Sequence, residues 1–310
     1  MLNFYKTINN RVTEIPGLED GCWVSAVAPT EEELHFLIED MSIDSGFVRA
    51  ALDEEEASRV DTDDNLTLVI VDVPTAQRAS EDAAIVYSTM PMAIIYTPQH
   101  IVTVSLKENA VISEISQGMV KNIQTDQKTQ FLLKMLLRIA SRFLQYLKQI
   151  DKLSDTTENL LHRLMRNKEI IQLLGLEKSL VYFSSSLKSN EVTLEKLLRG
   201  RILKLREEDE DLLEDVIIEV KQAIEMCGIY SNVLSGTMDA FASIISNNLN
   251  IVMKGLTSVT IVMAIPNMIF GMYGMNVQDL PFPFFWASIA LTFILMGIVA
   301  IILIKKGMFK

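Results

Sequence analysis

The chain has 310 residues, of which 49% are hydrophobic, and its formal net charge at pH 7 is -12. This charge argues against nucleic acid as a partner, because phosphates would be repelled, and an acidic surface concentrates cations instead. The sequence holds only two cysteines, Cys22 and Cys227, so a disulfide framework is not expected.

Residues 1–120 are predicted to form a cytoplasmic α+β domain in which a sheet carries a few packed helices. Runs of β-forming residues, separated by turn signals, occupy residues 22–27, 66–73, 83–90, 92–97 and 100–106. Thr30 and Glu33 have the spacing of a capping box and predict a helix that reaches residue 38. No glycine-rich phosphate loop, metal-binding cysteine pair or nucleophile motif occurs here. The sequence therefore does not predict an enzyme.

Residues 121–249 are predicted to form long helices and a stalk, because Gly and Pro almost vanish and helical periodicity begins. We expect one helix over residues 129–165 and another over residues 168–198. The acidic run from Glu207 to Asp211 is interpreted as a solvated turn and helix start. A third helix begins there, with a 4-3-4-3 apolar spacing that indicates coiled-coil-like packing. This seam comprises Leu213, Ile217, Val220, Ile224, Cys227, Ser231, Leu234, Met238, Phe241 and Ile245.

Two apolar segments follow, at residues 250–272 and 284–304, and each is close to the roughly 20 residues that cross a bilayer as a helix. No proline interrupts the third helix before the first apolar segment. This helix should therefore continue into the segment as one rod of about 60 residues, or about 90 Å. The linking loop, residues 273–283, has no Lys or Arg, whereas the tail, residues 305–310, is basic. The positive-inside rule then puts both termini in the cytoplasm and the loop outside. The alternative is a pair of buried helices in a soluble core.

One face of the first membrane segment is polar or small along its length. An Asn facing lipid would leave its amide unsatisfied, so this stripe is expected to meet protein or water. One alternative is helix–helix packing, which uses the same residue types. The other is a pore, which one hairpin cannot enclose and which requires a ring of identical chains. The stripe comprises Asn250, Met253, Thr257, Thr260, Ala264, Asn267, Gly271 and Gly274.

The tetrapeptide Tyr273-Gly274-Met275-Asn276 closes the first membrane segment. A Gly-Met-Asn triplet after Tyr, with two C-terminal membrane helices, a helical stalk and a basic tail, resembles the CorA family of divalent-cation transport proteins. The resemblance implies a funnel-shaped homopentamer in the plasma membrane, with the first membrane helix lining the pore. It also implies that Asn276 forms a ring at the outer mouth, shaped by Gly274 and Met275.

The resemblance implies further roles for residues of the stripe and the stalk. Asn250 would lie at the inner pore, Met253 and Leu256 would form an apolar constriction, and Asn267 would line the outer half. Asp239 resembles an acidic ring below the membrane. A regulatory Mg²⁺ would bind between protomers at Asp215, and its partners are guessed as Asp72, Glu81 and Asp82.

The function implied is a Mg²⁺ channel or transporter that is gated by cytoplasmic Mg²⁺ and that also passes Co²⁺ or Ni²⁺. A Zn²⁺-transporting relative on the same scaffold is the first alternative. The absence of His and Cys from the stripe favours harder ions. The second alternative is a two-span receptor or scaffold, which would conduct no ions and would not need Asn276.

Overall fold

The computed structural model describes residues 1–310 except 79–84, 165, 200–201, 204, 276–283 and 309–310. The chain divides into two compact units, Met1–Ser235 and Gly236–Lys310. The strands are β1 (Leu2–Ile8), β2 (Arg11–Ile15), β3 (Trp23–Val27), β4 (Arg59–Asp63), β5 (Leu66–Arg78), β6 (Ile85–Tyr96) and β7 (Ile101–Ser105). The helices are α1 (Glu31–His35), η1 (Phe36–Asp40), α2 (Ser45–Ala50), α3 (Ala110–Ser116), α4 (Lys128–Leu164), α5 (Asn167–Arg199), α6 (Glu207–Tyr273) and α7 (Phe285–Lys305).

The first unit contains a seven-stranded mixed sheet in the order β2-β1-β3-β7-β6-β5-β4. Only β3 and β7 run parallel; the other neighbours are antiparallel. The predicted runs 83–90 and 92–97 belong to one strand, β6, which continues through Pro91. β7 pairs with β6 only from Met92 onward, so Pro91 has no partner in β7. A proline, which lacks a backbone N–H, is tolerated at such an unpaired edge.

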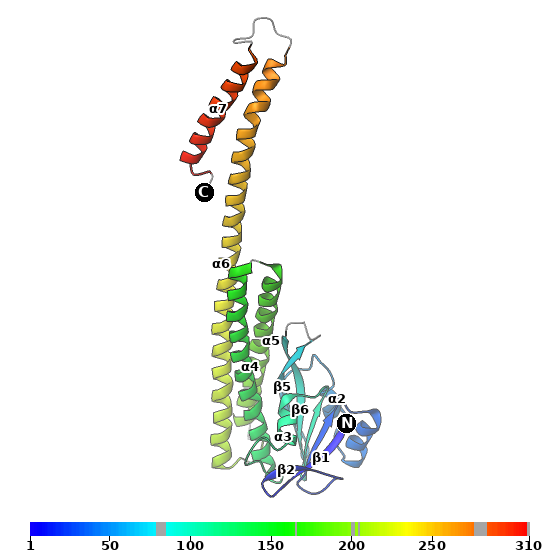
Figure 1. The fold of residues 1–310 in the computed structure, drawn as a ribbon. Helices are drawn as coiled ribbons and strands as arrows, with labels where there is room; N and C mark the ends of the chain where they lie inside the picture. Colours follow the sequence, from blue (N-terminus) through cyan, green and yellow to red (C-terminus); the bar gives the residue numbers. More distant parts are fainter. Residues whose placement is uncertain (79–84, 165, 200–201, 204, 276–283, 309–310) are drawn as a thin grey trace. The chain divides into compact units, whose positions relative to one another are not determined.

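The two faces of the sheet are covered by different helices (Figure 1). Alternation along β3 sends Val24 into an apolar cluster that includes Leu37 of η1 and Val48 of α2. Trp23 points the other way, lies 5.4 Å from the ring of Phe131 on α4, and donates from Nε1 to Thr103 Oγ1 at 2.9 Å. The predicted capping box at Thr30 is present and opens α1, which continues as the π-helical turn η1.

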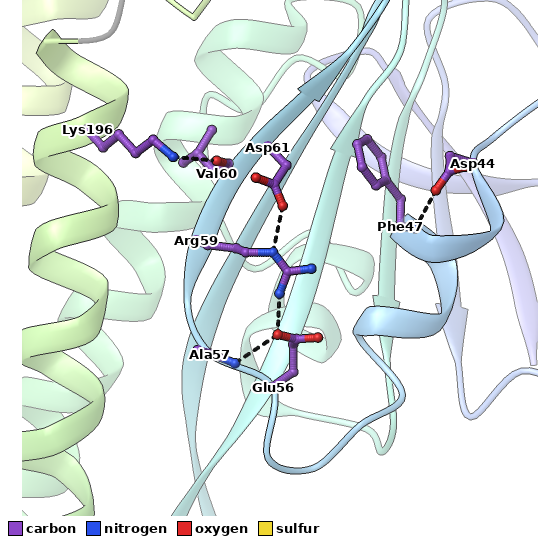
Figure 2. A network of polar contacts seen from close by, with 8 residues as sticks. All are labelled: Asp44, Phe47, Glu56, Ala57, Arg59, Val60, Asp61 and Lys196. Atoms are coloured by element: carbon purple, nitrogen blue, oxygen red, sulfur yellow. Dashed lines mark hydrogen bonds and ion pairs between the residues drawn. The ribbon is translucent and has the colours of Figure 1, made fainter.

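Side chains from α5 hold the far edge of the sheet. Lys196 Nζ donates to the Val60 carbonyl of β4 at 2.9 Å. Figure 2 shows this contact beside the pair that Arg59 makes with Asp61, where Nε and Oδ2 lie 2.6 Å apart. Arg59 also pairs with Glu56. Of these contacts, the Lys196 bond joins the short edge strand to α5, whereas the Arg59 pairs stay within the strand and the residues before it.

The predicted long helices are present as α4, α5 and α6, and α6 is one continuous helix of 67 residues, about 100 Å long. Its seam is buried at Leu213, Val220 and Leu234 in the first unit. Cys227 Sγ, in the same seam, donates to the Leu180 carbonyl of α5 at 3.1 Å. The seam does not extend to the predicted last member, because Ile245 is 43% exposed.

Candidate functional site: the membrane helices and the acidic stalk

The second unit contains the part of α6 that follows residue 235, together with α7, which runs alongside it in Figure 1. Among the described residues, α6 and α7 are the helices that are long and apolar enough to cross a membrane. Ser258 and Ile269 of α6 are buried, as are Ser288 and Thr292 of α7. The α7 side of α6 therefore includes small and polar positions as well as apolar ones.

The face of α6 that packs toward α7 follows a 3-4-3-4 spacing: Gly255, Ser258, Val262, Ile265 and Ile269 are all buried or half-buried. Ser258 Oγ lies 2.8 Å from the Lys254 carbonyl and 3.3 Å from the Met308 carbonyl, so its hydroxyl can donate to either. The second contact connects Met308, which follows α7, to Ser258 in the middle of this face of α6.

The polar stripe lies on the opposite side of α6. At about 100° per residue, its members centre about 180° from the face that holds Ser258 and Ile269. Leu256, which the resemblance places in a constriction, is 60% exposed. The side chains of the chain's own hairpin therefore leave this face open. Leu256 lies beside the stripe, and every member of the stripe is exposed as well: Asn250, Met253, Thr257, Thr260, Ala264, Asn267, Gly271 and Gly274.

Gly274 closes α6 with little room for a side chain. Its backbone N–H donates to the Phe270 carbonyl at 2.9 Å, and a Cβ added at Gly274 would lie 3.2 Å from that same oxygen. Met275 follows with an exposed side chain. Asn276, the predicted ring residue, lies outside the described residues, as do Glu81 and Asp82.

Pro266 removes one helix hydrogen bond from the membrane part of α6. The lost donor would have bonded to the carbonyl of Val262. Both residues are half-buried on the α7 side of the helix, so the site of the missing bond is away from the polar stripe.

The acidic residues of the predicted regulatory site have different surroundings. Asp215 is exposed on the first unit's part of α6, and Asp239 is exposed in the second unit. Asp72, on β5, is half-buried, and burial raises the pKa of its carboxyl although a hydrogen bond with Ser186 of α5 opposes that rise. Among the residues that the structure describes, no three His, Cys, Asp or Glu side chains gather closely enough to hold a metal.

The sequence profile of the family described as "CorA-like Mg2+ transporter protein" matches residues 19–306. The chain belongs to this family. Members of the CorA family are channel-type transporters and not enzymes. Together with the two apolar C-terminal helices, family membership implies that the chain resides in a membrane.

Among CorA proteins, a "Cobalt/magnesium transport protein CorA" from Methanocaldococcus jannaschii is 30% identical over 295 residues, covering 92% of this chain and 90% of that protein. The complete structure of the CorA magnesium transporter from the same organism matches with a TM-score of 0.80 at 25% identity, covering 98% of this chain and 96% of that one. The soluble α/β unit, the long helix and the two apolar helices are thus those of CorA.

The cytoplasmic domain of ZntB from Vibrio parahaemolyticus matches with a TM-score of 0.53 at 11% identity, covering 77% of this chain and 98% of that one. This likeness concerns the fold of the soluble unit alone.

Sequence reasoning missed two features of this CorA chain. The row of α6 residues that faces α7 could not be distinguished in the sequence, because most neighbouring residues are equally apolar. Gly255 and Ser258, three positions apart, could have indicated a helix-packing face. Asp209 was predicted to be solvated within its acidic run, and this is wrong: only 3% of its surface is exposed. The usable signal was spacing, because Asp209 lies four residues before Leu213 and in phase with the buried residues Val216 and Val220.

Proposed function

We propose that this chain forms a homopentameric Mg²⁺ channel in the plasma membrane, with the open stripe of α6 facing a central path. The observation that carries the proposal is the separation of the two faces of α6. Ser258 and Ile269 pack on the α7 side, while Asn250, Thr260 and Asn267 face away from it. Amides and hydroxyls on an open membrane face need polar partners, and a ring of copies around water supplies them.

Conduction in this scheme relies on neutral oxygens. Mg²⁺ gives up its water reluctantly, and a ring of carboxylates would hold it too tightly to let it leave. The amide oxygens of Asn276, Asn267 and Asn250 accept hydrogen bonds from water bound to the ion, so each site is favourable but weak. Met253 and Leu256 form an apolar constriction, which stops ions when it loses its water.

Gating in this scheme uses acids gathered between protomers. Asp215 of one chain meets a neighbouring soluble unit, for which Asp72, Glu81 and Asp82 are the proposed partners, and Asp239 forms an acidic ring. Bound Mg²⁺ neutralises the repulsion between these acids and holds the ring closed. When cytoplasmic Mg²⁺ falls, the carboxylates repel one another and the pore opens. Both termini lie in the cytoplasm in this arrangement.

Co²⁺ and Ni²⁺ are proposed as further permeant ions, because a hydrated divalent ion is selected mainly by its charge and water shell. The name of the relative from Methanocaldococcus jannaschii, a cobalt/magnesium transport protein, supports Co²⁺. A Zn²⁺ preference is the weaker alternative, since the stripe carries no His or Cys.

The deciding experiment is ion uptake into liposomes that contain the purified chain, with Mg²⁺, Co²⁺, Ni²⁺ and Zn²⁺ offered separately. We expect Mg²⁺ uptake that Co²⁺ and Ni²⁺ can replace. Uptake of Zn²⁺ alone would favour the zinc alternative, and no flux of any ion would favour a receptor or scaffold. Native mass measurement of the same sample should give five chains, and a stable dimer would exclude the proposed pore.

A further inference from the structure

The end of α7 is joined to α6 by a tight turn within the second unit. Gly307, at φ +68°, closes α7, and the Met308 N–H donates back to the Leu303 carbonyl at 3.1 Å. This turn brings the Met308 carbonyl to 3.3 Å from Ser258 Oγ of α6. The same hydroxyl lies 2.8 Å from the Lys254 carbonyl. Lys254 therefore lies at the same end of the hairpin as the last residues of α7.

Lys254 and Lys306 lie on the sides of α6 and α7 that face each other. Lys254 precedes the buried Ser258 by four positions, so the two are about 40° apart around α6. The row of α7 that faces α6 ends at Leu303, and Lys306 follows Leu303 at spacing three, about 60° away. Lys305 is instead about 160° from Leu303, on the outer side of α7. The buried or half-buried members of that row are Ser288, Thr292, Met296, Val299 and Leu303.

The two facing lysines have no carboxylate nearby within their unit. Lys254 and Lys306 are both exposed. Among the described residues of the second unit, the only acidic side chain is Asp239. Asp239 lies 15 positions before Lys254 on the same helix, or about 22 Å along its axis. Because like charges at one junction repel each other, the junction favours an anion between them.

The junction also has space that the hairpin leaves unfilled. Gly255 is half-buried beside Lys254, and a Cβ added to it would meet no atom within 4 Å. A Cβ added to Gly307, beside Lys306, would meet none either. From this end of the hairpin, exposed apolar side chains continue along both helices into the bilayer-spanning part. They include Val259 of α6 and Ile298, Ile301 and Ile302 of α7.

We propose that Lys254 and Lys306 bind the phosphate of one anionic phospholipid, whose acyl chains lie along these apolar side chains. Lys254 lies one turn inside the start of the apolar segment, and a lysine near a helix end reaches the headgroup level. Basic positions between membrane helices are suited to lipid phosphates. The leaflet follows from the proposed function, which puts the C-terminal end of α7 in the cytoplasm, so the lipid belongs to the inner leaflet.

A lipid at this junction would connect the two helices through a charged headgroup. Its phosphate would hold the end of α7 against the α7-facing side of α6. The opposite side of α6 carries the polar stripe, so the lipid would not enter the proposed conduction path. The charge of the surrounding membrane would then influence the position of the helix that carries the stripe.

The test is native mass spectrometry of the full chain in detergent, titrated with phosphatidylglycerol or with zwitterionic phosphatidylcholine. We expect one phosphatidylglycerol per chain, bound at least about tenfold more tightly than phosphatidylcholine. Lys254→Gln and Lys306→Gln should each weaken this binding by at least about fivefold. Lys305→Gln is the matched control, because it removes the same charge from the adjacent residue on the outer side of α7. It should retain the lipid.

Three outcomes would overturn the proposal. Equal losses in Lys305→Gln and Lys306→Gln would show a general attraction to positive charge, which does not depend on the side of the helix. Equal binding of phosphatidylcholine would show that the phosphate charge is not recognised. Displacement of phosphatidylglycerol by excess inorganic phosphate would assign the junction to a soluble anion. The measurement requires neither ion flux nor five chains, so failure of the proposed channel would leave its result unaffected.

Discussion

Ser258 and Thr260 lie two positions apart in α6 but on opposite sides of it: Ser258 is fully buried, and Thr260 is exposed. A separation of two residues turns the helix by about 200°. Ser258 therefore faces α7, and Thr260 belongs to the stripe that we propose to line the pore. The same kind of substitution at these two positions should have different effects.

Thr260→Leu should reduce Mg²⁺ uptake into liposomes by at least about tenfold, equivalent to about 1.4 kcal/mol, because it replaces a hydroxyl on the conduction path. Its thermal stability in detergent should stay close to that of the parent chain. Ser258→Leu should instead lower stability by about 1–3 kcal/mol, since it overfills a packed position. Equal losses of stability in the two variants would contradict the assignment of the two faces.

Asn276→Ala should abolish Mg²⁺ uptake while the oligomer stays intact, because it removes the proposed ring of amide oxygens. The measurement is uptake into liposomes together with native mass determination of the same protein. Gln278→Ala is the matched control, since it removes another amide from the same loop and should retain uptake. Full activity of the Asn276→Ala protein would mean that other residues form the mouth of the pore.

Asp215→Ala should weaken the protection that Mg²⁺ gives against limited proteolysis. The exposed carboxylate is proposed to bind Mg²⁺ against a neighbouring chain, so its removal should shift protection to higher Mg²⁺ concentration. Asp211→Ala, one turn earlier on the same helix, provides the comparison. If Mg²⁺ protects Asp215→Ala as well as it protects the parent chain, the regulatory ion binds at other residues.

Asn190→Ala should destabilise the first unit by about 2–6 kcal/mol. Asn190 Oδ1 accepts from the Asp72 backbone N–H at 2.8 Å, and its Nδ2 donates to the Asp72 carbonyl at 2.9 Å. Loss of the amide leaves a backbone donor and acceptor unpaired, at about 1–3 kcal/mol each. Urea unfolding should detect the change, and Ser185→Ala, on an exposed position of α5, should be near neutral.

The stability of the chain should respond to the protonation of Asp72. Burial raises the pKa of this carboxyl in the folded state above its ordinary value of 3.8. The folded state therefore favours the protonated form of Asp72. The contribution of this group to the stability of the folded state is complete below pH 3.8 and is lost as pH rises through the raised pKa. Asp72→Asn removes this dependence. Relative to the parent chain, the variant should gain stability as pH rises from about 4 to 7, and a constant difference in unfolding free energy would refute the expectation.

Periodic features of the sequence predicted the fold well, because a helix or strand repeats its burial pattern many times. The α6 seam from Leu213 to Leu234 and the open stripe from Asn250 to Gly271 are examples, and each rests on several residues at spacing three and four. The family match also confirms the resemblance to CorA that the sequence indicated.

Features that depend on one residue or on another chain could not be predicted in the same way. Asp209 resembles its acidic neighbours in residue type, and only its spacing from Leu213 distinguishes it. Asn190 lies 118 positions from Asp72 in the sequence, and no local pattern links them. The partners of Asp215 remain a prediction. Ligands that come from different protomers need not follow any fixed spacing in the sequence, so no sequence pattern identifies them.

Both native cysteines are buried: Cys22 lies against His100, with Sγ and Nδ1 3.6 Å apart, and Cys227 bonds to α5. Burial raises the pKa of the Cys22 thiol and raises that of Cys227 to about 11, so both stay protonated and unreactive at neutral pH. Thiol reagents should therefore leave the native chain unlabelled at neutral pH. Single cysteines introduced along the stripe can be mapped with charged, water-soluble reagents without first removing either natural one.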